Sequence, residues 1–152
     1  MLKFLGSFEA KIDAKARVFV PAVFRKILQS SAHNAFVLRK DIFQDCLVLY
    51  PEQAWGEELA KLRARLSRWD KQEQQLFRQF VVDAEKLEMD ASGRILIPKR
   101  YLQMLDLSSD VLFLGVGDTI EIWKKDKLDE TLMPAEDFSS MLQGLMGNSD
   151  KE

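Results

Sequence analysis

The sequence has few of the residues that build metal centres, disulfides and covalent catalytic sites. Among its 152 residues, Cys46 is the only cysteine and His33 is the only histidine. A single cysteine excludes a disulfide within the chain and fits a reducing cytoplasm. A structural zinc site or a histidine-dependent catalytic triad needs several such residues together, so we expect neither. Cys46 directly precedes the apolar run Leu47–Leu49, which favours a buried thiol over a nucleophile.

Long apolar runs and phosphate-binding loops are absent as well. No apolar run approaches the ~18 residues that a membrane-spanning helix needs. The apolar part of Met1–Gly6 is too short for a secretory signal. The sequence has neither a glycine-rich phosphate loop nor a nucleophile elbow. We therefore expect no enzymatic activity, no cofactor, no metal, no small-molecule substrate and no membrane partner.

Charge is unevenly distributed along the chain, although the net charge is only −2. Residues 1–50 carry eight Lys or Arg against four Asp or Glu, a net charge of +4. Residues 51–83 carry six of each sign, and residues 84–152 carry eight against fourteen, a net charge of −6. If one surface binds a polyanion, the first third of the chain is expected to supply it.

What the sequence does have is an internal repeat. The stretch Asp13-Ala14-Lys15-Ala16-Arg17-Val18-Phe19-Val20-Pro21 returns as Asp90-Ala91-Ser92-Gly93-Arg94-Ile95-Leu96-Ile97-Pro98. Asp, Arg, three apolar residues and Pro align without a gap at an offset of 77 (90 − 13). Agreement at all of these positions is improbable by chance, so the chain is interpreted as a duplicated unit.

Each copy of the repeat predicts a strand, a tight turn, a second strand and a short helix. Asp13 and Asp90 can accept hydrogen bonds from backbone amides two residues on, which is typical of turns. Gly93 can adopt a positive φ without a Cβ clash, and Ala16 occupies the same position in the first copy. We therefore predict that Asp13, Ala16, Asp90 and Gly93 shape the turns. Turn-shaping is also a more probable role for the two aspartates than catalysis.

The rest of the chain predicts an α+β fold in four parts. They are a first repeat at 1–50, a helical pair at 51–83, a second repeat at 84–130, and a C-terminal helix with a tail at 131–152. In the helical pair, Trp55, Trp69 and Phe80 are expected to pack in the core or between the two halves. Apolar residues at helical spacing from Phe138 to Met146 predict that the last helix docks on the chain's own core, with a neighbouring subunit as the alternative.

Four further segments accompany the two motif blocks, and they are Phe4-Leu5-Gly6, Asp45–Pro51, Phe77–Phe80 and Ile120–Trp123. Together, the motif blocks and these segments resemble the MraZ family of bacterial transcriptional regulators, in which two SpoVT-AbrB-like units are fused. The resemblance implies two pseudo-symmetric swapped-hairpin units that form one β-barrel, and assembly of several copies into a ring. It also implies binding to short G-rich direct repeats in double-stranded DNA upstream of the division and cell-wall gene cluster. The expected location is the cytoplasm, at the nucleoid.

The family's basic DNA-contacting pair corresponds to Lys15 and Arg17 in the first copy. The second copy keeps Arg94 but has Ser92 where the lysine would be. Arg94 is expected either to contact DNA or to form a structural bridge, to Asp90 or to the acidic second half. Arginine can pair with guanine through two hydrogen bonds in the major groove, which agrees with a G-rich site. Further candidates for phosphate contacts are Arg25, Lys26, Arg39 and Lys40.

Another function from a different class is compatible with the same fold. The chain could be an AbrB-like protein-interaction or antitoxin-type module with no operator to bind. The overall acidity favours this alternative, and so does Ala16. The family usually has glycine at this position, and alanine in a left-handed conformation costs roughly 1 kcal/mol.

Overall fold

The structure is a computed structural model that describes residues 3–30 and 35–150, so His33 lies outside the described residues. Within these ranges, six strands form one sheet in the order β1-β7-β8-β4-β3-β5, and β2 and β6 form a separate two-stranded ribbon. All the strand pairs are antiparallel. The strands are β1 (Phe4–Lys11), β2 (Arg17–Phe19), β3 (Ala35–Lys40), β4 (Cys46–Pro51), β5 (Glu85–Glu88), β6 (Arg94–Leu96), β7 (Asp110–Gly117) and β8 (Ile120–Lys124).

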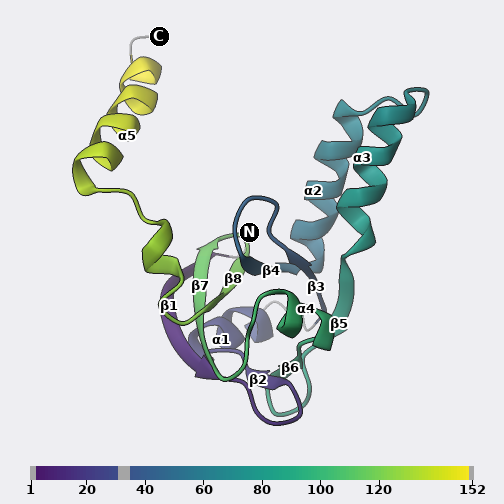
Figure 1. Ribbon diagram of the computed structural model, residues 1–152, viewed down its shortest axis with the longest axis vertical. Coiled ribbons are helices and arrows are strands. Elements are labelled where there is room, and N and C mark those ends of the chain that lie inside the picture. The colour runs from purple at the N-terminus through teal and green to yellow at the C-terminus, as the bar shows by residue number, and fades with distance from the viewer. Residues whose placement is uncertain (1–2, 31–34, 151–152) are drawn as a thin grey trace.

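Helices complete an α+β architecture (Figure 1). They are α1 (Ala22–Ser30), α2 (Glu52–Arg65), α3 (Lys71–Val82), α4 (Lys99–Met104), the 3₁₀ helix η1 (Leu128–Thr131) and α5 (Ala135–Asp150). The predicted helical pair between the repeats and the predicted C-terminal helix are both present. No closed sheet is found among the described strands, so the barrel and the hairpin exchange are not confirmed.

The first strand of each repeat pairs with the other repeat. β1 pairs with β7, and the equivalent strand β5 pairs with β3. β2 pairs with its counterpart β6, and β4 pairs with its counterpart β8. Because every one of these pairs joins the two halves, neither half has a complete sheet of its own.

The core lies between the six-stranded sheet and the short elements that follow each turn. Phe24 of α1 and Tyr101 of α4 occupy equivalent positions and are both fully buried. Edges of the Phe4 and Phe8 rings lie against Phe24, with ring centroids 5.6 and 5.3 Å apart. Each repeat thus contributes an aromatic residue at the same point of its short helix to one shared core.

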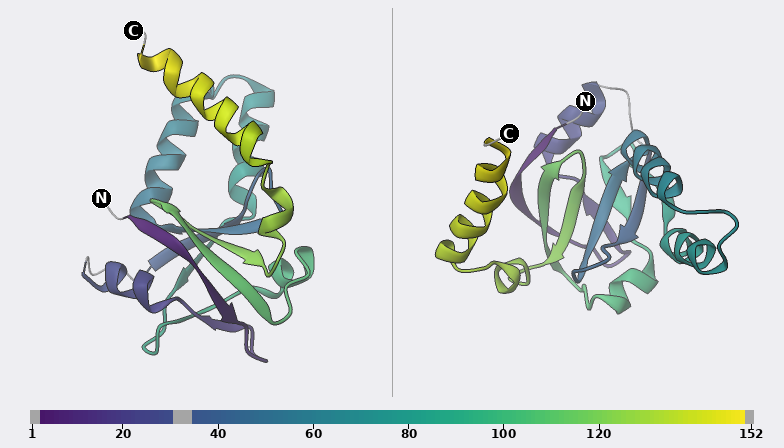
Figure 2. Two further views of the ribbon diagram at one scale, coloured as in Figure 1. Left: turned by 90° about the vertical axis from the view of Figure 1, so that its left-hand side faces the viewer. Right: turned by 90° about the horizontal axis from the view of Figure 1, so that it is seen from above.

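Helices α2 and α3 form a hairpin that projects from the sheet, on the side away from the β2–β6 ribbon (Figures 1 and 2). Near its base, Trp55 stacks on Phe80 with ring planes 5° apart and also contacts Tyr50. The prediction that Trp55 and Phe80 are packing residues is therefore confirmed. The same prediction is wrong for Trp69, because this residue is in the connection at the tip of the hairpin and is 97% exposed.

Helix α5 does not dock on the chain's own core, contrary to the first expectation from sequence. In Figure 1 it extends away from the sheet beyond η1. Its large apolar side chains are exposed, and they are Phe138, Met141, Leu142, Leu145 and Met146. The spacing of these residues predicted a helix correctly, but spacing alone does not determine which surface covers an apolar face.

Candidate nucleic-acid interface

The two motif blocks meet in the β2–β6 ribbon. Val18 pairs with Ile95 at its centre, and both side chains point into the core with 1% exposure. Successive side chains of a strand point to opposite faces, so the residues on either side of this pair lie on the outer face. These residues form two cross-strand pairs, Arg17 with Leu96 and Phe19 with Arg94. The ribbon therefore presents two arginines and two exposed apolar side chains at the end of the molecule opposite α2, α3 and α5.

The first turn is built around the carboxylate of Asp13. One carboxylate oxygen accepts hydrogen bonds from the amides of Lys15 and Arg17, each at 2.9 Å. The other accepts a hydrogen bond from Nε of Arg17 at 3.1 Å. The backbone closes the turn, because the Ala16 amide donates to the Asp13 carbonyl at 3.0 Å and the Asp13 amide donates to the Arg17 carbonyl at 2.8 Å. This frame orients the Arg17 side chain.

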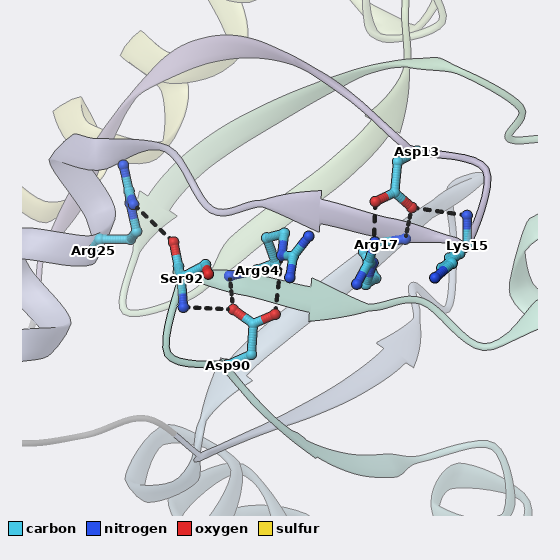
Figure 3. A network of polar contacts seen from close by, with 7 residues as sticks. All are labelled: Asp13, Lys15, Arg17, Arg25, Asp90, Ser92 and Arg94. Carbon is cyan, nitrogen blue, oxygen red and sulfur yellow. Dashed lines mark hydrogen bonds and ion pairs between the residues drawn. The ribbon is translucent and has the colours of Figure 1, made fainter.

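The second turn repeats this frame at the other end of the ribbon (Figure 3). The Asp90 carboxylate accepts hydrogen bonds from the amides of Ser92 and Arg94 at 2.9 Å and from Nε of Arg94 at 3.0 Å. The backbone bonds also match, at 3.0 Å from Gly93 to Asp90 and 2.8 Å from Asp90 to Arg94. Since corresponding hydrogen bonds agree in length within 0.1 Å, the two turns share one hydrogen-bonding frame and differ mainly in their side chains.

Positions 16 and 93 both have the left-handed backbone conformation. Ala16 has a φ of 65° and Gly93 a φ of 91°. Each residue also adds a hydrogen bond between the two strands beyond the end of the ribbon. The Ala16 carbonyl accepts a hydrogen bond from the Ile97 amide at 2.9 Å, and the Gly93 carbonyl accepts one from the Val20 amide at 3.0 Å. Alanine in this conformation is strained by contact between its Cβ and the backbone. The turn therefore forms with alanine at a cost in stability.

The two aspartates remain ionised at neutral pH. The amide of Arg17 lowers the pKa of Asp13 most strongly, with further lowering by the Lys15 amide and the Arg17 guanidinium. The amide and guanidinium of Arg94 lower the pKa of Asp90 in the same way. Both guanidinium groups use Nε to bind their aspartate. No hydrogen bond from their Nη atoms is found within 3–30 and 35–150, so the outer edge of each fork remains available to a ligand.

Lys15 and Ser92 make the two turns chemically different. Lys15 is exposed at the tip of the first turn and adds a second cation beside Arg17. Ser92 is exposed at the same place in the second turn and carries no charge. Arg25 of α1 lies beside the second turn, where its Nη1 donates to the Ser92 carbonyl at 3.4 Å.

Comparison with known proteins assigns the family. The family model described as "MraZ protein, putative antitoxin-like" matches the chain twice, at residues 3–79 and 80–142. The chain belongs to the MraZ family. It is 53% identical over 146 residues to a Bacteroides fragilis protein named transcriptional regulator MraZ, with 96% of this chain and 92% of the relative covered. It is 51% identical over 149 residues to the Phocaeicola vulgatus protein of the same name, with 98% and 97% covered.

The expected MraZ resemblance is thus confirmed, and the structure places two residues on the candidate interface that the sequence did not point out. Phe19 and Leu96 were interpreted only as apolar strand residues. Side chains alternate between the two faces of a strand, and Phe19 and Leu96 lie two residues after Arg17 and Arg94. This alternation alone would have placed them on the outer face beside the arginines.

The predicted phosphate contacts Arg39 and Lys40 instead have partners inside the fold. Nε of Arg39 donates to the Phe80 carbonyl at 2.7 Å, and Nζ of Lys40 donates to backbone carbonyls.

Away from the ribbon, Asp41, Cys46 and Glu121 bring possible metal ligands within 4.8 Å of one another. Each of them has another role in the fold. The Asp41 carboxylate accepts hydrogen bonds from the amides of Phe43 and Gln44, and the Glu121 carboxylate accepts one from Nε1 of Trp123. Burial raises the pKa of the Cys46 thiol, which keeps it protonated at neutral pH. In the part of the chain that is described, no helix is both long and apolar enough to cross a membrane.

Proposed function

We propose that this chain is a DNA-binding transcriptional regulator that reads guanine through the two turns of the β2–β6 ribbon. The observation that carries the proposal is the pair of Asp-supported arginines, Arg17 and Arg94, at the two ends of one exposed ribbon. The names of its relatives, which are transcriptional regulators, support the same conclusion.

The ribbon has suitable chemistry for major-groove binding. The groove admits a two-stranded β-ribbon, and an arginine fork can donate two hydrogen bonds to O6 and N7 of guanine. Asp13 and Asp90 hold the arginines in place before DNA arrives, which reduces the side-chain entropy lost on binding. Lys15 has a compact charge that suits a phosphate or a single base acceptor. The exposed Phe19 and Leu96 would add apolar contacts to base methyl groups.

The proposed target is a set of short G-rich direct repeats upstream of the division and cell-wall gene cluster, at the nucleoid. One ribbon makes few contacts, so tight binding requires several copies to bind several repeats at once. We propose that the chain assembles into a ring. The exposed apolar side chains of α5 support assembly, since such a surface commonly marks a protein interface.

We further propose that residues 1–50 and 84–130 form a single swapped-hairpin barrel unit, with 51–83 and 131–152 as helical additions. The pairing of β1 with β7 and of β5 with β3 supports this arrangement. A shared unit would explain why both arginines reach the same face, since neither repeat alone would build the ribbon.

DNA binding by the full-length protein tests the proposal. Fluorescence anisotropy would compare a duplex of G-rich direct repeats with one in which the G·C pairs are replaced by A·T pairs. Arg17→Ala should weaken binding to the G-rich duplex by about 1–3 kcal/mol per site, which is roughly 5- to 150-fold, and should reduce the preference for guanine. The matched control is Arg68→Ala, which removes an exposed arginine from the α2–α3 connection.

An interaction or antitoxin-type module remains the second candidate, because the matching family model is itself described as antitoxin-like. The same titration separates the two functions. If the assembled wild-type protein binds neither duplex at low salt, the regulator proposal is wrong and the module is favoured. Equal weakening by Arg17→Ala and Arg68→Ala would show that the charge matters but that the turn does not read bases.

A further inference from the structure

We infer that Arg25 is a DNA phosphate contact of the second turn and supplies the cation that this turn lacks at Ser92. The inference rests on the proposed function, since it concerns the same interface. It makes the second turn a composite site, with its frame from the second repeat and one of its two cations from the first.

The first observation is where Arg25 lies. It belongs to α1, yet its guanidinium lies against the turn of the other repeat and donates from Nη1 to the carbonyl of Ser92 (Figure 3). Arg25 and Arg94 approach the exposed ring of Phe19 at 6.0 and 5.7 Å from its centroid. The second turn therefore has two guanidinium groups around one aromatic ring.

Gly93 is what allows this approach. A Cβ at position 93 would lie 2.6 Å from Cδ of Arg25 and 2.7 Å from its Nη1. Gly93 thus provides space for the arginine as well as the left-handed turn. The equivalent of Arg25 in the second repeat is Leu102, at the same offset of 77 (102 − 25), so α4 has no cation at this position. Each turn therefore has one additional cation, Lys15 in the first and Arg25 in the second.

Arg25 is also bound too weakly to be explained as a structural bridge. Its hydrogen bond to Ser92 is long, at 3.4 Å, and its buried Nε has no hydrogen-bond partner in the described parts of the chain. Arg39 is a structural arginine in the same protein, and its Nε donates at 2.7 Å to a carbonyl while its guanidinium lies 4.4 Å from the Phe80 ring centroid. Arg25 is half-buried, and its Nη2 has no hydrogen bond within the described residues, so Nη2 is the donor that it can offer to a phosphate oxygen.

Salt dependence of DNA binding distinguishes a phosphate contact from a structural role. Each phosphate contact that is lost reduces the slope of log K against log salt by about 0.9. For the full-length protein on the G-rich duplex, Arg25→Ala should reduce the slope by this amount per bound subunit and weaken binding about tenfold at 0.1 M salt. Unlike Arg17→Ala, it should preserve the preference for guanine, because phosphate contacts carry no base information.

The double variant Arg25→Ala/Ser92→Lys is the decisive measurement. It returns a cation to the second turn at the position that Lys15 has in the first, so it should restore both the slope and the affinity. If the double variant stays as weak as Arg25→Ala, Arg25 has a structural role only and the inference is wrong. The inference is also wrong if the salt slope of DNA binding is the same for Arg25→Ala as for Arg68→Ala.

Failure of this inference differs from failure of the proposed function. If wild-type protein binds and Arg17→Ala loses guanine preference while Arg25→Ala behaves like Arg68→Ala, only the role of Arg25 is rejected. If wild-type protein does not bind the duplex, the proposed function is rejected and this inference with it. Thermal unfolding of each variant verifies that it is folded.

Discussion

At one end of the ribbon Asp13 holds Arg17, and at the other Asp90 holds Arg94, with hydrogen bonds that differ in length by no more than 0.1 Å. Around these equal frames the side chains differ. The first turn has Lys15 and the strained Ala16, whereas the second has Ser92 and Gly93 with Arg25 beside it. The comparison teaches that one Asp–Arg frame forms with either Lys15 or Ser92 beside it and with either alanine or glycine at the left-handed position.

The largest expected effect comes from breaking the ribbon that both turns share. Ile95 is buried and pairs with Val18, so Ile95→Ala should destabilise the fold by about 2–4 kcal/mol through lost burial and a cavity. Its neighbour Leu96 is 58% exposed, and Leu96→Ala should change stability by less than about 0.5 kcal/mol. Urea unfolding measures both variants. Equal losses would mean that the two faces of the ribbon are not inner and outer as described.

A smaller effect is expected from making the second turn resemble the first. Gly93→Ala places a strained left-handed alanine against Arg25, which must move away. We expect a loss of about 1–2 kcal/mol in the free energy of unfolding. We also expect a smaller salt slope for DNA binding, since the displaced Arg25 leaves the turn. Unchanged stability would show that the left-handed conformation at position 93 is not required.

The reverse change should stabilise the protein. Ala16→Gly removes a strain of roughly 1 kcal/mol at a φ of 65° but increases the entropy of the unfolded chain, so the net gain should be smaller, about 0.5 kcal/mol. For a chain of this size the melting temperature should rise by roughly 1–2 °C. Differential scanning calorimetry of Ala16→Gly and Gly93→Ala together would test the comparison directly. The two shifts should have opposite signs.

The sequence was sufficient to predict the repeat, the α+β class and the positions of both turns. The reason is that turn chemistry is local: Asp13 bonds to residues only two and four positions away. The pairing of β2 with β6 and the approach of Arg25 to Ser92 join residues 67 to 79 positions apart, and no local pattern contains them. Burial of Trp69 and the docking of α5 were predicted wrongly, because an apolar residue does not show which surface covers it.

The smallest expected effect concerns pH and tests whether the two turns are electrostatically equivalent. Hydrogen bonds from Arg17 and Arg94 lower the pKa values of Asp13 and Asp90 below the ordinary value of 3.8. The unfolded chain therefore binds more protons at acid pH, so the stabilisation is complete above about pH 5 and decreases as the pH falls through the folded pKa. Asp13→Asn and Asp90→Asn should each be less stable than the wild type at neutral pH, with a difference that shrinks below about pH 5. Urea unfolding across this range measures the difference, and the two variants should lose it over the same interval. A difference that persists unchanged at the lowest pH would show that these carboxylates do not stabilise the turns through their charge.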